Sequence, residues 1–418
     1  MHKKYTIFGS LLAVAIVLAS IISIAYVGTS HNQESHAATP AVSCTVSSLL
    51  VNSCRPWLGA KSGAYDLPAG TADTPLNQLT AHEDRIGRQV DISHIYHTAG
   101  QALNKDDKTM ALRAGTYVFM DWKPAADWAT GSDTSNATTN ASIDTMAASV
   151  KSLGTKKLFI TVWHEPQNDV NAGLYPCTAA SGKSGTPAQY RAMWQNVRDR
   201  FTALGVTNVV WAIDYQSYEP LDCMIDDLYP GDNLVDWIVF NGYGNNTHND
   251  FTANVQHYYD FFTTHTDATH SYTSKKWGMI EWGLNGSSAA AGVQYYKDAK
   301  TALDTNIFPR LKMYAIFDSI GPDVPVKDYR VAYDGNSVFS QAKQDAYTAF
   351  AHDPRFTDAY YEQASGVIGD ITGDGRVNAL DLSVLISHDG QPYTSADLNG
   401  DGTVGAADLA IVLGHWTW

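Results

Sequence analysis

Residues 158–169 read LFITVWHEPQND, and the fold and site are best approached from this stretch. Strand-forming residues run directly into Trp163, His164 and Glu165, and polar residues follow at once. A strand that only builds a core has no need to end on a histidine and a carboxylate. A strand that ends at the mouth of a parallel barrel does, because such barrels carry their chemistry at the carboxyl ends of the strands.

The sequence on both sides of this stretch alternates between strand-like and helix-like segments, about eight times over roughly 300 residues, as in a (β/α)₈ barrel. One helix has clear ends: Thr186 and Gln189 form a capping box, Pro187 takes the first helical position, and Gly205 ends it. The pattern predicts the α/β class and a (β/α)₈ TIM barrel. A doubly wound open sheet is the alternative, but no Gly-rich phosphate loop follows the first predicted strand.

Composition and charge narrow the class of partner. The chain has 418 residues, of which 44% are hydrophobic and 11% aromatic, so a large core leaves aromatic side chains for a ligand surface. The formal net charge is −15, which argues against nucleic acid, because a nucleic-acid partner requires a basic surface.

The N-terminal region predicts export. Residues 1–37 combine two lysines with a long apolar run, and Ser35-His36-Ala37 offers a cleavage site. An uncleaved N-terminal anchor is the alternative, and it would be the only contact with a membrane. Residues 38–55 are assigned to a linker and N-terminal segment. Either interpretation predicts an extracellular protein, secreted and possibly attached to the cell surface.

The four cysteines agree with export, since an oxidising compartment favours two disulfides over free thiols. Four cysteines allow three pairings, of which the local one, Cys44 with Cys54 and Cys177 with Cys223, is the predicted one. The second bond would join the loops that follow the fourth and fifth predicted strands.

Two predicted strands end on glutamate, at Glu165 and at Glu281 in GMIEWG (278–283). The two lie 116 residues apart, about three βα units, so they are expected to face each other across the barrel mouth. Facing carboxyl groups are what glycoside hydrolysis requires. The neighbouring Trp163 and Trp282 would raise the pKa of the acid by excluding water. The alternative is that each glutamate pairs with a basic residue of the barrel.

These motifs resemble a known family. VWHEP (162–166), FNGYG (240–244) and EWG (281–283) are similar to clan A glycoside hydrolases. His164 stands where most of that clan has Asn, which resembles glycoside hydrolase family 26, the β-mannanase family. The resemblance covers about residues 56–356, the predicted catalytic domain.

The resemblance implies a retaining endo-β-glycanase without a catalytic cofactor, in which Glu165 is the general acid/base and Glu281 the nucleophile. The expected substrate is a β-linked polysaccharide of the mannan type. Phe317 stands near a strand end where the family often has Trp, and the loop after Glu165 lacks the family's aromatic run. Another clan A activity (β-xylanase or β-glucanase) and a non-catalytic polysaccharide-binding surface protein are the alternatives. The predicted substrate-binding residues are His97, Asp121, Trp122, Trp163, His164, Asn241, Tyr243, Trp282 and Phe317.

The C-terminal region carries an internal repeat after a predicted linker at 357–365. GDITGDGRVNALDLSVLISH (369–388) and ADLNGDGTVGAADLAIVLGHW (396–416) both have the ligand spacing of a calcium loop followed by an apolar helix. The predicted Ca²⁺ ligands of the two sites are Asp370, Thr372, Asp374, Arg376, Asn378 and Asp381, then Asp397, Asn399, Asp401, Thr403 and Asp408.

The duplicated loops resemble the type I dockerin, which would occupy residues 366–418. That resemblance implies calcium-dependent folding and a cohesin module as the partner. The positions that usually contact the cohesin are Ala379-Leu380 and Ala406-Ala407, which are apolar here.

Overall fold

The computed structural model describes residues 43–417 apart from 64–66, 180, 246, 287, 322–325, 365, 366, 368, 373–375, 392–395 and 400–402, with the backbone alone at 362–364. The chain divides into two compact units, of which one is Val42–Ala364 and the other includes Ser365–Trp418. The predicted export segment lies outside the described residues. Among the described residues, no helix is long and apolar enough to cross a membrane.

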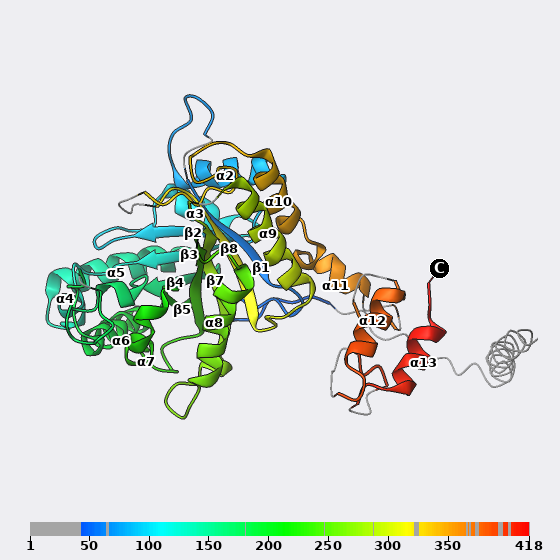
Figure 1. Cartoon of the computed structure of the whole chain (residues 1–418). Coiled ribbons are helices and arrows are strands. Elements are labelled where there is room, and N and C mark those ends of the chain that lie inside the picture. The colour runs from blue at the N-terminus through cyan, green and yellow to red at the C-terminus, as the bar shows by residue number, and fades with distance from the viewer. Residues whose placement is uncertain are drawn as a thin grey trace, which may run out of the picture. The chain divides into compact units, whose positions relative to one another are not determined.

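Eight parallel strands of the first unit close into a barrel, and the helices wrap its outside (Figure 1). Closure is direct, since β1 pairs with β8 along its whole length, from Trp57 opposite Met313 to Ser62 opposite Asp318. The TIM-barrel prediction is confirmed, and the open-sheet alternative is wrong. The strands are β1 (Trp57–Ser62), β2 (Ile92–His97), β3 (Tyr117–Trp122), β4 (Leu158–Val162), β5 (Val209–Tyr215), β6 (Trp237–Gly244), β7 (Lys276–Leu284) and β8 (Leu311–Asp318).

The helices begin where the sequence places caps. In α6, Thr186 and Gln189 form the predicted capping box and Pro187 opens the helix. The helices of this unit are α2 (Pro75–Ile86), α3 (Lys105–Leu112), α4 (Trp128–Ser132), α5 (Ala137–Lys151), α6 (Pro187–Ala203), α7 (Ile225–Leu228), α8 (Phe251–Thr264), α9 (Ala289–Asp304), α10 (Gln341–Ala351) and α11 (Asp358–Ala364). The last of these takes up most of the segment predicted as a linker.

Alternation along each strand separates two cores. Phe119 and Phe159 belong to the cluster inside the barrel, whereas their neighbours Met120 and Ile160 belong to the layer between strands and helices. Successive side chains of a strand point to opposite faces. Near the end of β3 the same rule turns Asp121 inward and Trp122 toward the helices, which decides which residues can reach the barrel mouth.

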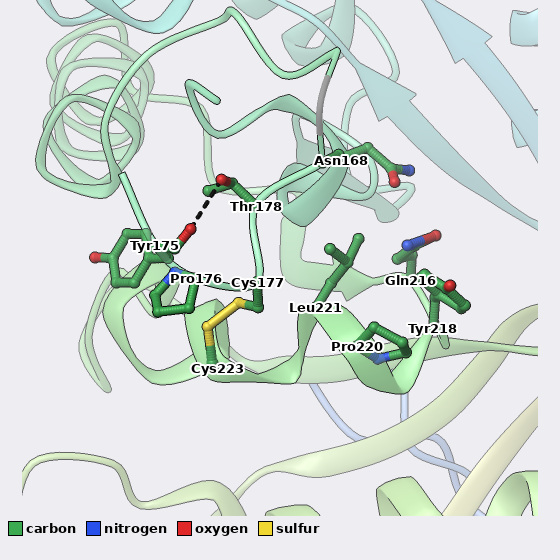
Figure 2. A pocket seen from close by; sticks show the side chains of 11 residues that line it. Asn168, Tyr175, Pro176, Cys177, Thr178, Gln216, Tyr218, Pro220, Leu221 and Cys223 are labelled. Carbon is green, nitrogen blue, oxygen red and sulfur yellow. Dashed lines mark hydrogen bonds between the residues drawn. A yellow bond between two sulfur atoms is a disulfide. The ribbon is translucent and has the colours of Figure 1, made fainter. Parts of the chain in front are cut away.

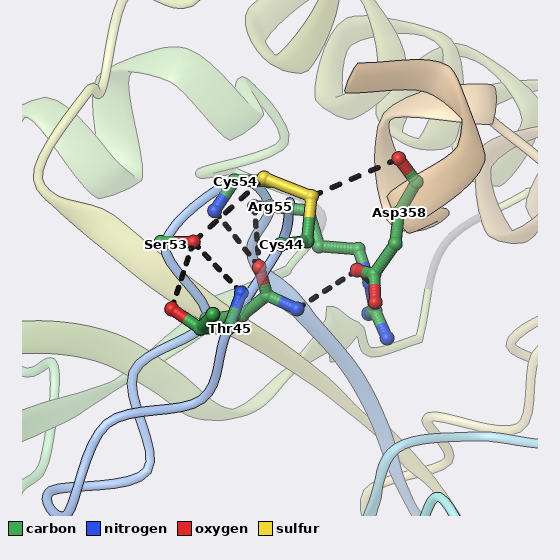
Figure 3. Close-up of a disulfide and its surroundings, with 7 residues drawn as sticks. Cys44, Thr45, Ser53, Cys54, Arg55 and Asp358 are labelled. Atoms are coloured by element: carbon green, nitrogen blue, oxygen red, sulfur yellow. Dashed lines mark hydrogen bonds and ion pairs between the residues drawn. A yellow bond between two sulfur atoms is a disulfide. The ribbon is translucent and has the colours of Figure 1, made fainter. Parts of the chain in front are cut away.

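The N-terminal segment covers the amino ends of the strands. Both predicted disulfides are confirmed, and Cys44–Cys54 closes this segment into a loop (Figure 3). Leu50 packs into the inner cluster, and Trp57 Nε1 donates a 2.7 Å hydrogen bond to its carbonyl. Asp358 of α11 accepts from Arg55 Nε at 2.6 Å. The barrel is therefore closed at the amino ends of its strands, and a substrate can enter only at the carboxyl ends.

The second unit contains α12 (Ala379–Ser387) and α13 (Ala406–Gly414), one after each repeat. Val377, Leu385, Val404 and Val412 form its small core. The predicted helix after each loop is therefore present.

Candidate active site

Glu165 lies just beyond β4 on a backbone of unusual conformation. Trp163 has a φ of 70° and Glu165 a φ of 47°, both in the left-handed region that non-glycine residues rarely adopt. The turn brings the carboxyl group into the barrel mouth. Two amides hold it there, since Asn241 Nδ2 donates to Oε1 at 2.6 Å and Asn168 Nδ2 donates to Oε2 at 2.9 Å.

Glu281 reaches the same cleft through an irregularity in β7. Phe240 of β6 pairs with Met279, but the next residue, Asn241, pairs with Glu281, so Ile280 is an extra residue on β7. Such a bulge reverses the alternation beyond it. Met279 packs against the helices, and without the bulge Glu281 would face the same way. The bulge instead turns Glu281 into the barrel.

Phenol groups surround the Glu281 carboxyl group. Tyr243 Oη donates to Oε2 at 2.8 Å, and Tyr96 Oη donates to Oε1. His94 Nδ1 is 3.7 Å from Oε1. These donors favour the ionised carboxylate, because hydrogen bonds to a charged acceptor stabilise the charged form.

Burial and neighbouring carboxylates raise the pKa values of both glutamates. Burial, and then the nearby Glu281, raise the pKa of Glu165 to about 8. Burial also raises the pKa of Glu281, but His94 and the hydrogen bonds from Tyr96 and Tyr243 oppose the rise. One carboxyl group therefore keeps its proton at neutral pH more readily than the other, as acid and nucleophile require.

His164 lies at the centre of an acidic cluster. Its Nε2 is 3.4 Å from Glu281 Oε2, 3.5 Å from Asp214 Oδ2 and 3.9 Å from Asp121 Oδ2. Asp121 Oδ2 also contacts His94 Nε2 at 2.6 Å. Burial lowers the pKa of His164, which favours the neutral imidazole. By spacing alone Asp121, His164 and Asp214 could also hold a cation, since their ligand atoms lie within 4.8 Å of one another.

A cleft of about 880 Å³ opens above the two glutamates. This volume lies in the range of small-molecule sites, and aromatic rings form one wall: Tyr243 and Tyr329 have centroids 4.3 Å apart, with Phe317 beside them. Residues around the cleft include Tyr96, His164, Glu165, Asn168, Gln216, Tyr218, Tyr243, Glu281, Phe317, Lys327 and Tyr329.

The structure brings most of the predicted site residues together. Both glutamates, His164, Tyr243 and Phe317 line the cleft. Asp121 and Asn241 lie fully inside the barrel, directly behind them, and hold His94 and Glu165. Asn241, predicted as a substrate-binding residue, therefore contacts the predicted acid/base directly.

Three tryptophans do not reach the cleft, which corrects their assignment as substrate-binding residues. Trp122 and Trp282 are fully buried against the helices, because strand alternation turns each away from its inward-facing neighbour. Trp163 is 2% exposed and donates from Nε1 to Asp169 Oδ2 at 2.8 Å. Its ring packs edge to face with that of Trp128, with centroids 5.9 Å apart.

His97 is also placed differently from its predicted role as a sugar contact. It points away from the cleft and its Nε2 lies 2.9 Å from Asp107 Oδ2, in the first turn of α3. Its neighbour Tyr96 lines the cleft instead, and His94, on the same face of β2, points into the barrel beside Glu281. Those two were missed, although the alternation in ISHIYH (92–97) could have separated them from His97.

Three further residues of the site were not predicted from the sequence: Asp214, Asn168 and Tyr329. Asp214 ends the inner face of β5, where its two buried oxygens have no hydrogen-bond partner among the described residues. Burial and Asp121 raise its pKa well above the ordinary value. Asn168 lies in a single 3-10 turn (Pro166–Asp169) and Tyr329 in an irregular segment, and neither leaves a periodic signal in the sequence.

The repeats of the second unit hold their last predicted ligands in place. Asp381 is buried and accepts from the backbone N–H groups of Thr372 and Asn378, both at 2.8 Å. Asp408 accepts in the same way from Leu398 at 2.7 Å and Gly405 at 2.8 Å. The other predicted calcium ligands would all coordinate through oxygen atoms, which suits Ca²⁺. They are Asp370, Thr372, Arg376, Asn378, Asp397, Asn399 and Thr403. Asp374 and Asp401 lie outside the described residues.

Comparisons with known proteins assign the two units to two different families. Residues 102–279 match the model of Glycosyl hydrolase family 26, and residues 368–415 match that of the Dockerin type I domain. Both resemblances inferred from the sequence are therefore confirmed. The chain carries a family 26 glycoside hydrolase region followed by a type I dockerin.

Individual relatives are distant. Endoglucanase H from Acetivibrio thermocellus is 26% identical over 198 residues, which cover 44% of this chain and 20% of that protein. The chain thus spans about a fifth of the length of this curated relative. The structure of GH26C from Muricauda sp. MAR_2010_75 has 15% identity and a TM-score of 0.50, covering 72% of this chain and 86% of that one. This likeness supports the fold.

A second structure is similar at the same level. The catalytic domain of the GH26 endo-beta-1,4-mannanase from Bacillus sp. JAMB-750 has 15% identity and a TM-score of 0.48, covering 72% of this chain and 86% of that one.

Proposed function

We propose that this glycoside hydrolase is a secreted, retaining endo-β-glycanase that cleaves β-1,4-mannan. The observation that carries the proposal is the carboxyl pair, since one oxygen of Glu165 and one of Glu281 lie within 4.8 Å of each other. Retaining enzymes hold their carboxyl groups about 5–5.5 Å apart, whereas inverting enzymes leave about 6.5–9.5 Å for a water molecule. The close pair supports a double displacement.

In the first step, Glu281 attacks the anomeric carbon and forms a glycosyl ester. Tyr96 and Tyr243 hold its oxygens in place for the attack. Glu165, protonated at neutral pH because its pKa is about 8, gives its proton to the leaving oxygen. The bond to the leaving sugar breaks with the electron pair on that oxygen, so no free alkoxide is released.

In the second step, Glu165 acts as a base. The ester removes the negative charge of Glu281, which is the second cause of the raised pKa of Glu165. The pKa of Glu165 therefore falls in the intermediate, and its carboxylate accepts a proton from an incoming water. That water attacks the same carbon and frees Glu281, which gives retention of configuration.

His164 and the residues behind it position the pair. A neutral His164 next to Glu281 Oε2, at 3.4 Å, can donate one hydrogen bond either to that carboxylate or to a sugar hydroxyl. Asp121 and Asn241 support His94 and Glu165 from below. We assign Tyr243 and Phe317 to the walls that contact the sugar.

The choice of mannan rests on His164 and the family 26 match of residues 102–279. A β-glucanase is the second candidate, because the chain is similar to a protein named Endoglucanase H. The test is hydrolysis of galactomannan, glucomannan, xylan and mixed-linkage glucan by residues 38–418 with calcium. Cleavage confined to mannans supports the proposal. Cleavage of another polymer retains the mechanism but rejects mannan, and binding without cleavage rejects the enzyme.

We propose that the dockerin, residues 366–418, holds the enzyme on a cohesin through two calcium loops. A catalytic domain at 56–356 and an extracellular location are part of the same proposal. Calorimetry with and without EDTA tests it: chelation should abolish the transition of the dockerin, while the barrel transition stays within about 2 °C. Loss of the barrel transition, or no change in either, would contradict it.

A further inference from the structure

Two spaces open at the carboxyl ends of the strands, and they differ in charge. The space between the loops that follow β4 and β5, about 750 Å³, has no acidic, basic or histidine side chain among the described residues of its lining (Figure 2). The catalytic cleft instead lies above carboxyl groups buried inside the barrel. One of them, Asp214 of β5, is used by neither step of the proposed reaction. A cation at this end of the barrel would therefore be bound beneath the cleft.

Strand alternation brings Asp214 together with two other polar side chains. Val210 and Ala212 of β5 belong to the cluster inside the barrel, so Asp214, two residues further on, also points inward. Asp121 points inward from β3, and His164 follows β4, the strand between them. One ligand atom of each of these three residues lies within 4.8 Å of those of the other two.

The polar atoms of this group are poorly satisfied by the protein. Asp214 is fully buried, and neither of its carboxyl oxygens has a hydrogen-bond partner among the described residues. The same holds for Asp121 Oδ1 and His164 Nε2. Asp214 Oδ2 and His164 Nε2 are 3.5 Å apart, which is longer than an ordinary hydrogen bond. Because buried polar atoms normally have partners, these atoms indicate a ligand shared by the three side chains.

The spacing and the chemistry of the group suit Zn²⁺. Bonds of about 2.0–2.1 Å in a tetrahedral site place neighbouring ligand atoms about 3.3–3.4 Å apart. His164 Nε2 is 3.5 Å from Asp214 Oδ2 and 3.9 Å from Asp121 Oδ2, so shifts of about half an ångström would complete the site. Imidazole nitrogen with carboxylate oxygen is typical of zinc, whereas Ca²⁺ and Mg²⁺ prefer oxygen alone. Two carboxylates also balance the charge of a divalent ion.

We propose that Asp121, His164 and Asp214 bind one Zn²⁺ ion beneath the catalytic cleft, and that the bound ion inhibits hydrolysis. His164 lines the cleft, so the ion can enter from there and keep a fourth position for water. His164 Nε2 is also 3.4 Å from Glu281 Oε2. Zinc on this nitrogen would displace the proton that it donates and would place positive charge beside the nucleophile. The inhibition rests on the proposed function, whereas the site itself does not.

Titration calorimetry with ZnCl₂ on residues 38–418 tests the site, with saturating Ca²⁺ to keep Zn²⁺ from the predicted calcium loops. We expect one Zn²⁺ per chain with a Kd of about 1 µM or lower. Asp214→Asn and His164→Asn should each weaken binding by at least about 100-fold. Asp267→Asn is the matched control, because Asp267 Oδ1 lies 3.1 Å from His270 Nδ1 in a pair at the surface. The control should keep the wild-type Kd within about twofold.

Co²⁺ in place of Zn²⁺ reports the coordination. A four-coordinate site with a nitrogen ligand should give strong visible absorption, whereas six-coordinate oxygen sites absorb weakly. The site is rejected if no Zn²⁺ binds in the presence of Ca²⁺, or if folded Asp214→Asn and His164→Asn keep the wild-type Kd. Weak Co²⁺ absorption by wild type rejects it as well, even where a variant does not fold.

Hydrolysis assays separate the site from its effect. Activity of wild type and Asp267→Asn on a mannan polymer should fall at least about 10-fold as Zn²⁺ saturates, with half of the loss at the Kd. Zinc that binds without inhibition would reject the inhibitory role and leave the site. If wild type cleaves no polysaccharide even without Zn²⁺, the proposed function fails, and calorimetry still decides whether the site exists.

Discussion

The end of β4 and the end of β7 present the same side chain to the same cleft by different means. Glu165 arrives through two left-handed residues beyond its strand, and Glu281 through an extra residue within its strand. The partners differ as well. Amides hold Glu165, whereas phenols and a histidine surround Glu281. Two carboxyl groups in one cleft can therefore take different protonation states, and the following experiments test whether they do.

Removal of the nucleophile should have the largest effect. We expect Glu281→Ala to lower kcat on a mannan polymer by at least about 10⁴-fold, because no other group forms the glycosyl ester. The fold should persist, as measured by circular dichroism and thermal melting. A folded Glu281→Ala protein with more than a hundredth of wild-type activity would mean that the two glutamates do not have the proposed roles.

Removal of the acid should cost less and should depend on the leaving group. We expect Glu165→Gln to lose about 10²–10⁴-fold on a sugar leaving group. The loss should be much smaller in formation of the ester from a nitrophenyl glycoside, measured as a pre-steady-state burst, because nitrophenolate leaves without a proton.

The pH dependence of Glu165→Gln tests whether Glu165 is the acid. Wild-type activity should fall as pH rises through about 8, where Glu165 loses its proton. That basic limb should be absent in Glu165→Gln. A variant that retains the limb would assign it to another group.

The hydrogen bond from Tyr243 should have an intermediate effect. It favours the ionised form of Glu281, so Tyr243→Phe should raise the pKa of Glu281 and move the acidic limb of kcat/KM to higher pH. The loss at neutral pH should be about 10-fold, typical of a hydrogen bond to a charged group. The measurement is a pH profile of both proteins, and an unmoved acidic limb would contradict the role of Tyr243.

The smallest effect concerns stability. The pKa of Glu165 rises from an ordinary 4.5 to about 8 on folding, so between these values the native state binds the proton more tightly than the unfolded state. The free energy of unfolding therefore falls as pH rises through this window. Glu165→Gln has no such proton to lose. Its free energy of unfolding, relative to that of wild type, should therefore be about 1–3 kcal/mol higher at pH 9 than at pH 5. Urea denaturation at both pH values measures it, and parallel curves would contradict the raised pKa.

Much of the architecture could be read from the sequence. The alternation of strands and helices predicted the barrel, and the repeats predicted two loops with a helix after each. Glutamates at two strand ends predicted a site at the barrel mouth. The cysteine pairing followed from proximity in the chain. These features depend on local periodicity and on short sequence separations, which a single sequence displays directly.

The contents of the cleft depended on the tertiary structure. Tyr96 and His97 are adjacent, as are Asp121 and Trp122, and only the orientation of each strand in the barrel decides which residue of the pair points inward. The cleft wall also includes Tyr329, from an irregular segment with no periodic signal.

Glu281 illustrates the limit most clearly, because regular alternation from Met279 would turn it toward the helices. A bulge is visible only in the pairing of two strands, and a left-handed turn is held by contacts that surround it. By itself the sequence determined the barrel and the strand ends that carry the two carboxyl groups. Packing between distant segments decided where those groups point and which neighbours set their pKa values.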